Sequence, residues 1–279
     1  MIKSILVSTD GSPYGDIAAE YAISLSKRLG ARLIGLHTLD SRMLDGPLMA
    51  DISGWLGAQP YAGQLPQFRE LLEEKGKAVL TSFADRCEKE NIAAETILKT
   101  GHPAHVALQE EARAELLIFG QKGEHAQWSG MLGSITERII RSSNRPSMIT
   151  PESYRPIDKI LCAFDGSDHA GNALHEATEL AVGLDVELLI LTVTEDDDFE
   201  TAERTAVDGL KLAQAHGCTC GMRVAGGEAR RVILEQAGEQ GCDLIVMGAY
   251  GHSRIREMIL GSVTTHVIAH TTVPVMFVR

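Results

Sequence analysis

The chain has 279 residues, of which 44% are hydrophobic and 23% charged, a composition typical of globular proteins. Its formal net charge of −12 and the lack of a long Lys/Arg run argue against a nucleic-acid partner, because binding phosphate backbones depends on clustered basic residues. No apolar run approaches the roughly 20 residues that span a bilayer, and the five cysteines follow no regular framework. We therefore expect a cytoplasmic protein that binds neither nucleic acid nor membranes.

The first elements of the chain are a strand and a helix joined by a short turn. The apolar run "ILVST" (residues 5–9) predicts a buried strand, which ends in Asp-Gly-Ser at residues 10–12. Residues 12–30 then predict an amphipathic helix, with Gly30 as its stop. The residues that share its apolar face are Ile17, Ala18, Tyr21, Ala22 and Leu25.

After a second strand at residues 33–40, a segment rich in Gly and Pro (residues 41–66) predicts a long loop. A long amphipathic helix, a third strand (residues 93–101) and a short helix follow. A fourth strand, "LLIFG" (residues 116–120), leads into a glycine-rich loop, a helix and a last strand. The long helix is marked by Phe68, Leu72, Val79, Phe83 and Cys87.

The second half of the chain repeats this order. "ILCAFDGS" follows "ILVSTDGS", and the later strands recur at residues 188–195, 218–227, 244–248 and 273–279. The copies are offset by 155 residues at the Asp-Gly-Ser turns and by 128 at the glycine loops, so the first copy is 27 residues longer. An ordered internal repeat of this kind indicates a duplicated domain.

The repeat predicts two domains, residues 1–152 (with an insertion at about residues 41–66) and residues 155–279, joined by the linker "PESYRP" (residues 151–156). Strands that alternate with helices predict an α/β fold: in each domain, a mostly parallel five-stranded sheet with helices on both faces. In such a sheet, ligands bind beyond the carboxyl ends of the strands, where the winding reverses.

Both copies place an Asp and a glycine loop at such strand ends. A strand, a glycine loop and a helix start together predict an anion site, because backbone amides and the helix dipole converge there. Ser262 stands where a helix N-cap is expected. The alternative is that the glycines only form tight turns and that the Asp only caps the first helix. Because both features recur in register, we favour nucleotide binding. The residues are Asp10, Gly120, Gly123, Gly133 and Ser134 in the first half, and Asp165, Gly248, Gly251, Gly261 and Ser262 in the second.

Both halves resemble universal stress protein domains, whose ATP-binding members carry the pattern G-2x-G-9x-G-[S/T] that both glycine loops match. The resemblance implies a Rossmann-like (adenine nucleotide alpha hydrolase-like) fold and ATP, with Mg²⁺, as the ligand. It implies that Asp10 and Asp165 lie at the adenosine and that the backbones of Thr38 and Val193 contact adenine. The acidic run "EDDD" (residues 195–198) would repel phosphates if it turned inward.

The function expected from this resemblance is that of an ATP-binding regulatory protein of the stress response. The GK[ST] ending of P-loop ATPases is absent, and neither glycine loop offers an obvious base, so we expect no catalytic residues and at most slow ATP hydrolysis. Two alternatives stay open: a stress scaffold that holds no nucleotide, and an adenylate-forming enzyme. The turns lack the second glycine of the S-G-G-x-D-S pattern of adenylating relatives.

Two small clusters suggest a metal site at first sight. Cys218 and Cys220, near His216, alternate on an expected strand, which makes them more consistent with core residues. His266 and His270 share a helix face but lack a third ligand. We therefore expect neither cluster to hold a metal, and no other residues in the sequence predict a metal site.

The last strand of each copy is expected at a sheet edge. "VPVMFV" is short and apolar, and an exposed edge of that kind pairs with another strand unless it is covered. We expect the two last strands to pair antiparallel about a pseudo-twofold axis, so that one chain forms an intramolecular pseudo-dimer. The alternatives are two independent halves on a linker, and a homodimer of whole chains.

Overall fold

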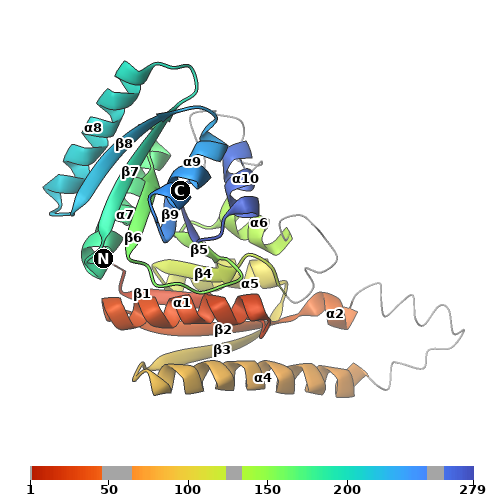
Figure 1. The fold of residues 1–279 in the computed structure, drawn as a ribbon. Helices are drawn as coiled ribbons and strands as arrows, with labels where there is room; N and C mark the ends of the chain where they lie inside the picture. Colours follow the sequence, from red (N-terminus) through yellow and green to blue (C-terminus); the bar gives the residue numbers. More distant parts are fainter. Residues whose placement is uncertain (1, 46–64, 124–133, 250–260) are drawn as a thin grey trace, which may run out of the picture.

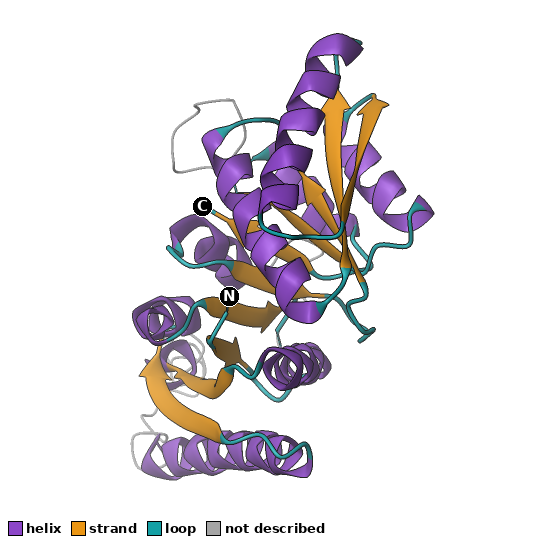
Figure 2. Ribbon diagram, turned by 90° about the vertical axis from the view of Figure 1, so that its left-hand side faces the viewer, coloured by secondary structure: helices purple, strands orange, loops and turns teal. Residues whose placement is uncertain are grey.

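The computed structural model describes residues 2–45, 65–123, 134–249 and 261–279 (Figure 1). The ten strands found within these residues form one sheet in the order β3-β2-β1-β4-β5-β10-β9-β6-β7-β8. Figure 2 shows this sheet twisting between helices on its two faces. None of the described helices combines the length and apolar character needed to cross a bilayer. The α/β prediction is confirmed.

The first half contributes five strands, all parallel to one another. They are β1 (Ser4–Ser8), β2 (Arg32–Asp40), β3 (Ala94–Gly101), β4 (Leu116–Gly120) and β5 (Ser147–Thr150). The helices are α1 (Pro13–Leu29), α2 (Ser41–Asp45), α4 (Leu65–Lys89), α5 (Pro103–Glu110) and α6 (Ser134–Ser142), with a 3₁₀ turn at Glu111–Arg113. The expected loop at residues 41–66 is wrong at both ends: α2 begins directly after β2, and α4 already begins at Leu65.

The second half repeats the arrangement, again with parallel strands. Its strands are β6 (Lys159–Ala163), β7 (Glu187–Thr194), β8 (Cys220–Gly226), β9 (Leu244–Gly248) and β10 (Val275–Val278). Its helices are α7 (Asp168–Leu184), α8 (Phe199–Ala215), α9 (Ala229–Glu239) and α10 (Ser262–His270).

The first helix of each half starts in the same way. The Ser12 side chain accepts a hydrogen bond from the backbone N–H of Gly15 at 3.2 Å, and Ser167 does the same for Ala170 at 3.3 Å. These bonds satisfy amide groups that the helix itself leaves without partners. The helix ends also agree with the sequence: Gly30 closes α1 with φ of 65°, a left-handed conformation that glycine adopts without strain.

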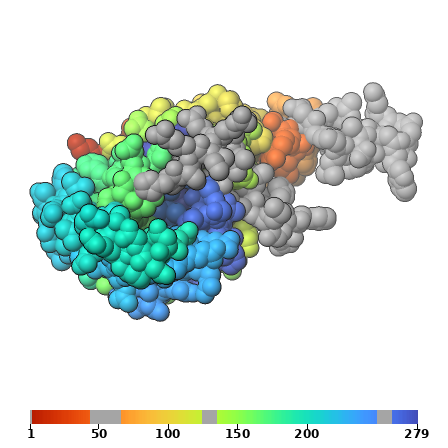
Figure 3. Space-filling model, turned by 90° about the horizontal axis from the view of Figure 1, so that it is seen from above, coloured from red at the N-terminus to blue at the C-terminus, as the bar shows by residue number. Residues whose placement is uncertain are grey.

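The two halves meet edge to edge through their last strands. β10 pairs antiparallel with β5, and Met276 lies opposite Met148 with both side chains fully buried. The hydrophobic cores on the two faces of the sheet each contain residues of both halves. The expected antiparallel pairing is therefore confirmed. In the space-filling view the first half (red to yellow-green) and the second half (green to blue) form one continuous body (Figure 3).

The linker between the halves is docked on α1. The Tyr154 hydroxyl donates to Ser24 Oγ at 2.9 Å, and the backbone N–H of Arg155 donates to the Tyr21 hydroxyl at 3.2 Å. Arg28 of α1 reaches further, donating to the carbonyls of Ile157 at 2.6 Å and of Leu184 at 2.9 Å. Two independent halves on a linker are thus excluded as a description of this chain.

Candidate functional site

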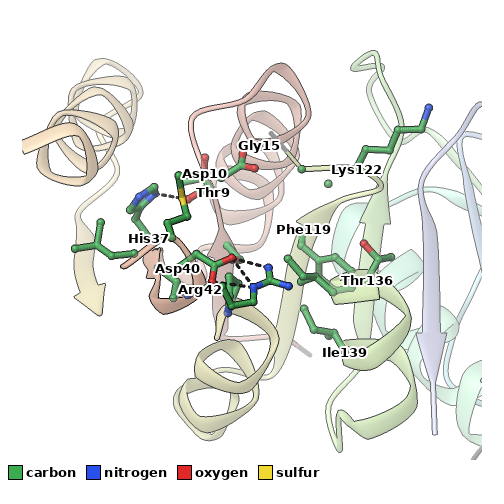
Figure 4. A pocket seen from close by; sticks show the side chains of 18 of the residues that line it. Thr9, Asp10, Gly15, His37, Asp40, Arg42, Phe119, Lys122, Thr136 and Ile139 are labelled. Carbon is green, nitrogen blue, oxygen red and sulfur yellow. Dashed lines mark hydrogen bonds and ion pairs between the residues drawn. The ribbon is translucent and has the colours of Figure 1, made fainter. Parts of the chain in front are cut away.

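A pocket of about 310 Å³ lies at the carboxyl ends of β1, β2 and β4 (Figure 4). β2 lies on one side of β1 and β4 on the other, so this is the point where the winding of the first half reverses. Helices α2, α4 and α6 supply further walls. The lining includes Ser8, Thr9, Asp10, Gly15, His37, Thr38, Asp40, Arg42, Leu72, Lys75, Phe119, Gly120, Lys122, Gly123, Ile135, Thr136 and Ile139.

Asp10 is held in place by the turn that follows β1. Its Oδ1 accepts hydrogen bonds from the backbone N–H of Ser12 at 3.0 Å and from the Ser12 hydroxyl at 2.5 Å. The turn depends on Gly11, whose φ of 77° favours glycine. A Cβ at Gly15 would lie 2.7 Å from the same carboxylate oxygen, so α1 starts directly against it. The carboxylate is therefore a fixed feature of the pocket wall.

The first two glycines of the loop after β4 have different structural reasons. A Cβ at Gly120 would lie 2.8 Å from the Cβ of Tyr14 and 3.0 Å from its backbone carbonyl carbon, so this glycine allows β4 to pack on α1. A Cβ at Gly123 would lie 3.1 Å from Asp10 Oδ2, which places the loop beside the carboxylate. Gly133 lies outside the described residues, and Ser134 is the first residue of α6, with its side chain outside them.

Three cationic side chains line the pocket, and the sequence analysis identified none of them. Lys122 follows Gly120 in the loop; its Nζ lies 3.8 Å from Glu152 Oε1 and 5.7 Å from the centroid of the Tyr14 ring. Lys75 extends from α4. Arg42 belongs to α2, which starts the 41–66 insertion. The signal available in the sequence was Lys122, a basic residue two positions after Gly120.

Arg42 forms a fork with Asp40 at the end of β2 (Figure 4). Its Nε lies 2.9 Å from Oδ1 and 3.0 Å from Oδ2, and its Nη2 lies 2.5 Å from Oδ2. Burial raises the pKa of Asp40, but the hydrogen bonds from Arg42 outweigh it, so the pKa lies below its ordinary value. Asp40 is thus ionised and neutralised at neutral pH, and both residues stay fixed at the pocket.

His37 and Thr38 are neighbours on β2, yet they face opposite sides of the sheet. The buried His37 ring bonds the Thr9 carbonyl through Nδ1 at 2.8 Å, next to α4. Thr38 lines the pocket, and its Oγ1 is buried without a hydrogen-bond partner among the described residues. The sequence analysis expected only a backbone contact from Thr38, because an orphaned hydroxyl cannot be read from sequence.

The second half builds the same turn. Asp165 Oδ1 accepts from the Ser167 backbone N–H at 3.0 Å and from its hydroxyl at 2.6 Å, and Gly166 has φ of 81°. Val193 lies near the end of β7, packed against the core. The repeat thus reproduces the frame of the first site.

The glycine loop of the second half is described only at its two ends. Gly248 ends β9, Gly261 is the residue before α10, and Gly251 lies outside the described residues. The expected N-cap is wrong by one residue: the N-cap is Gly261, and Ser262 is the first helical residue. Because glycine has no side chain, α10 starts without a side-chain cap.

The acidic run at residues 195–198 is engaged in local hydrogen bonds. Glu195 Oε1 accepts from the backbone N–H of Ala229 at 2.9 Å, at the start of α9. Asp198 caps α8 by accepting from the backbone N–H of Thr201 at 3.1 Å. Negative side chains at helix N-termini are stabilising, so these carboxylates have a structural role.

The Cys cluster lies in the core, and the His cluster lies at the surface. Cys218 is buried in the core and Cys220 packs against it, as their alternation predicted. His266 and His270 stack with ring centroids 4.1 Å apart, and His270 Nδ1 bonds the His266 carbonyl at 2.8 Å. Within the described residues, no three His, Cys, Asp or Glu side chains are grouped to hold a metal ion.

Comparison with known proteins gives consistent matches over the whole chain. A universal stress protein of Synechocystis is 29% identical over 287 residues, with all of both chains covered. One of Bacillus subtilis is 34% identical over 146 residues, covering 44% of this chain and 99% of that protein. The crystal structure of a universal stress protein from Archaeoglobus fulgidus has a TM-score of 0.77 at 24% identity, covering 99% of this chain and 96% of that one.

The structural match shows a shared fold over nearly the whole length of both chains. The model of the universal stress protein family matches twice, at residues 1–151 and 156–279, and so covers nearly the whole chain. The chain therefore belongs to the universal stress protein family, as a member with two tandem domains.

Proposed function

We propose that this protein is an ATP-binding regulatory member of its family and that the pocket of the first half holds the nucleotide. The observation that carries the proposal is a convergence. Asp10, Thr38, Gly120 and Gly123 follow or end three different strands, and all four line one pocket. They are the residues that the resemblance implies for adenosine and phosphate contacts.

The chemistry of the walls supports a nucleotide. The pocket lies near the lower end of the ~300–1,000 Å³ range of small-molecule sites. Phe119, Ile135 and Ile139 give it an apolar side suited to a base. Lys122, beside the glycine loop and the start of α6, gives it a cationic side suited to phosphates. Cations here contrast with the net charge of −12, so the positive charge is local.

Magnesium fits this site only in company with the phosphates. Mg²⁺ is usually held by one or two carboxylates, waters and substrate phosphates. Asp10 is the pocket carboxylate suited to this role, because the Asp40 carboxylate is occupied by Arg42. We therefore propose that Mg²⁺ enters as the ATP complex.

The contacts of the loop suggest how nucleotide occupancy reaches the rest of the molecule. Gln121, between Gly120 and Lys122, donates from Nε2 to the Ile268 carbonyl of α10 in the other half. Lys122 itself lies near Glu152 of the linker. A ligand that binds Lys122 would therefore change the contacts that this loop makes at the junction of the two halves. This arrangement supports a regulatory role.

The test is nucleotide binding by the purified protein and by matched variants. We expect adenine nucleotide in an acid extract, or ATP binding by calorimetry together with an ATP-dependent rise in melting temperature. Gly123→Val should abolish binding in the first half, because the side chain would fill the space beside Asp10. If wild type carries no nucleotide and ATP shifts neither signal, the proposal fails and the scaffold alternative stands.

A further inference from the structure

The two halves differ in the side chains they present at the carboxyl ends of their first two strands. Ser8 ends β1, and the repeat places Ala163 at the same point of β6. Thr38, near the end of β2, corresponds to Val193 of β7. The first half therefore carries two hydroxyl groups at positions where the second half carries only hydrocarbon.

Thr38 belongs to the face of the sheet that forms the apolar side of the pocket. Side chains two apart on a strand share a face, so Thr38 follows Ile34 and Leu36. Those two residues are in the same core cluster as Phe119 and Ile139, which also line the pocket. Thr38 therefore lies on the apolar side of the pocket, which is suited to a base.

The Thr38 hydroxyl has no hydrogen-bond partner among the residues that the structure describes. Its Oγ1 is buried and makes no hydrogen bond within the described part of the chain. A buried hydroxyl without a partner costs free energy, and a valine of nearly the same shape would avoid that cost. The second half has that valine, in the same frame. The hydroxyl thus lowers the stability of the first half, and no contact among the described residues offsets this loss.

Thr192, in the strand that carries Val193, shows the contrasting case. Its buried hydroxyl donates to the Phe164 carbonyl at 2.8 Å, and His37 bonds the corresponding Thr9 carbonyl in the first half. The Thr192 hydroxyl therefore has a structural role, whereas the Thr38 hydroxyl has none among the residues that the structure describes.

We propose that Thr38 is a specificity-determining residue, whose hydroxyl hydrogen-bonds the polar edge of the nucleobase in the first half. The inference rests on the proposed function and deepens it. A hydroxyl can accept from an exocyclic amino group or donate to a ring nitrogen, and rotation about the Cα–Cβ bond turns it toward the pocket. Val193 cannot make this bond, so the second half lacks this contact.

The experiment compares Thr38→Val with Thr192→Val in a Gly261→Val background, which hinders phosphate approach in the second half. ATP affinity is measured by calorimetry, and the melting temperature is measured without ligand. Thr38→Val should weaken ATP binding by about 2- to 12-fold, the equivalent of one hydrogen bond, while melting stays equal or rises. Thr192→Val should lower melting and leave the first-half affinity unchanged.

Opposite signs for affinity and stability are the signature of a hydroxyl that serves the ligand. Unchanged ATP affinity in Thr38→Val would overturn the inference, and so would a parallel fall of affinity and melting temperature. These results differ from failure of the proposed function, in which the parent protein itself binds no ATP. An analogue triphosphate lacking the 6-amino group gives a second arm. Its affinity should respond less to Thr38→Val if the amino group is the partner, and should respond as ATP does if a ring nitrogen is.

Discussion

The two halves of this chain share one backbone frame of turns, helix caps and strand order, but they carry different side chains at the ends of their strands. The Asp-Gly-Ser turns agree closely: the bond from the serine N–H to the aspartate is 3.0 Å at both Asp10 and Asp165. The hydroxyls of Thr136 and Thr264 also bond corresponding carbonyls, both at 3.3 Å. Turns, caps and strand order are therefore repeated almost unchanged.

The halves diverge directly after their second strands. In the first half, Asp40 is bound by Arg42 of α2, and α2 and α4 extend the wall of the pocket. In the second half, the corresponding Glu195 caps the start of α9. The same strand end thus lines a pocket in one half and caps a helix in the other. The difference teaches that the repeated frame fixes where a site lies, while the residues beyond the strands decide what it binds.

The largest expected effect comes from removing the strand that joins the halves. Ending the chain at Thr272 deletes β10, whose four residues are all buried, and exposes the edge of β5. We expect aggregation or strand exchange, because an unpaired apolar edge recruits another strand. Size-exclusion chromatography with light scattering measures the change.

A chain that lacks only Arg279 is the control for this deletion, since it keeps all of β10. It should elute as the full-length protein does. If the chain ending at Thr272 keeps the wild-type mass and the first half melts unchanged, the shared edge does not hold the halves together.

The next largest effect separates two glycines of the same motif. Gly120→Ala would force a Cβ to within 3.0 Å of Tyr14 backbone atoms, whereas a Cβ at Gly261 would meet no described residue closer than 3.6 Å. Overpacking of this kind costs about 1–3 kcal/mol, so we expect Gly120→Ala to lower the free energy of unfolding by that amount. Gly261→Ala should be nearly neutral.

For Gly261 the backbone gives no reason against a side chain, because its φ is −59°. Any loss of ATP binding by the second half in Gly261→Val would then come from blocked ligand approach. Urea unfolding and calorimetry of both variants measure the two properties. Equal destabilisation by Gly120→Ala and Gly261→Ala would mean that the two glycines serve one purpose.

The sequence predicts the frame better than the site. Apolar runs and the doubled Asp-Gly-Ser turns were enough to place the strands, and the apolar last strands predicted the pairing of β5 with β10. The fork between Asp40 and Arg42 was missed because the insertion has no counterpart in the repeat to compare with. The α10 cap was misplaced by one residue, because Gly261 and Ser262 are adjacent and both residue types occur at N-caps.

A smaller effect is expected from Arg42, and it depends on pH. Arg42→Ala removes the side-chain hydrogen bonds that lower the pKa of Asp40 most and keeps only the weaker backbone hydrogen bond of residue 42, so the pKa should rise from its lowered value. In wild type the lowered pKa stabilises the fold above about pH 4, and this contribution is lost as the pH falls through the folded pKa. The variant should lose that contribution and, at neutral pH, bind ATP several-fold more weakly, because an uncompensated carboxylate repels phosphates.

Arg42→Lys is the matched control, since lysine keeps the charge but cannot form the fork. We expect it to fall between wild type and Arg42→Ala in ATP affinity. Calorimetry at neutral pH and melting between acid and neutral pH test both expectations. A pH–melting curve of Arg42→Ala that overlays wild type would show that the fork contributes nothing.

The smallest effect is expected at Ser262. Because Ser262 is exposed and the N-cap is Gly261, Ser262→Ala should leave the melting temperature nearly unchanged. If the second half binds nucleotide, the variant should lose only about 0.5–1.5 kcal/mol of binding, since the loop amides stay in place. Calorimetry in a Gly123→Val background isolates this half, and a complete loss there would show that the hydroxyl outweighs the amides.

Hydrogen exchange with and without ATP tests most directly whether the first-half pocket holds the nucleotide. Mass spectrometry of the intact protein, digested after labelling, resolves the backbone amides of each strand end. We predict ATP-dependent protection in the peptides that carry Asp10, Thr38 and Gly123, which converge on the pocket from three separate segments. Bound ATP that leaves all three peptides unprotected would contradict the account.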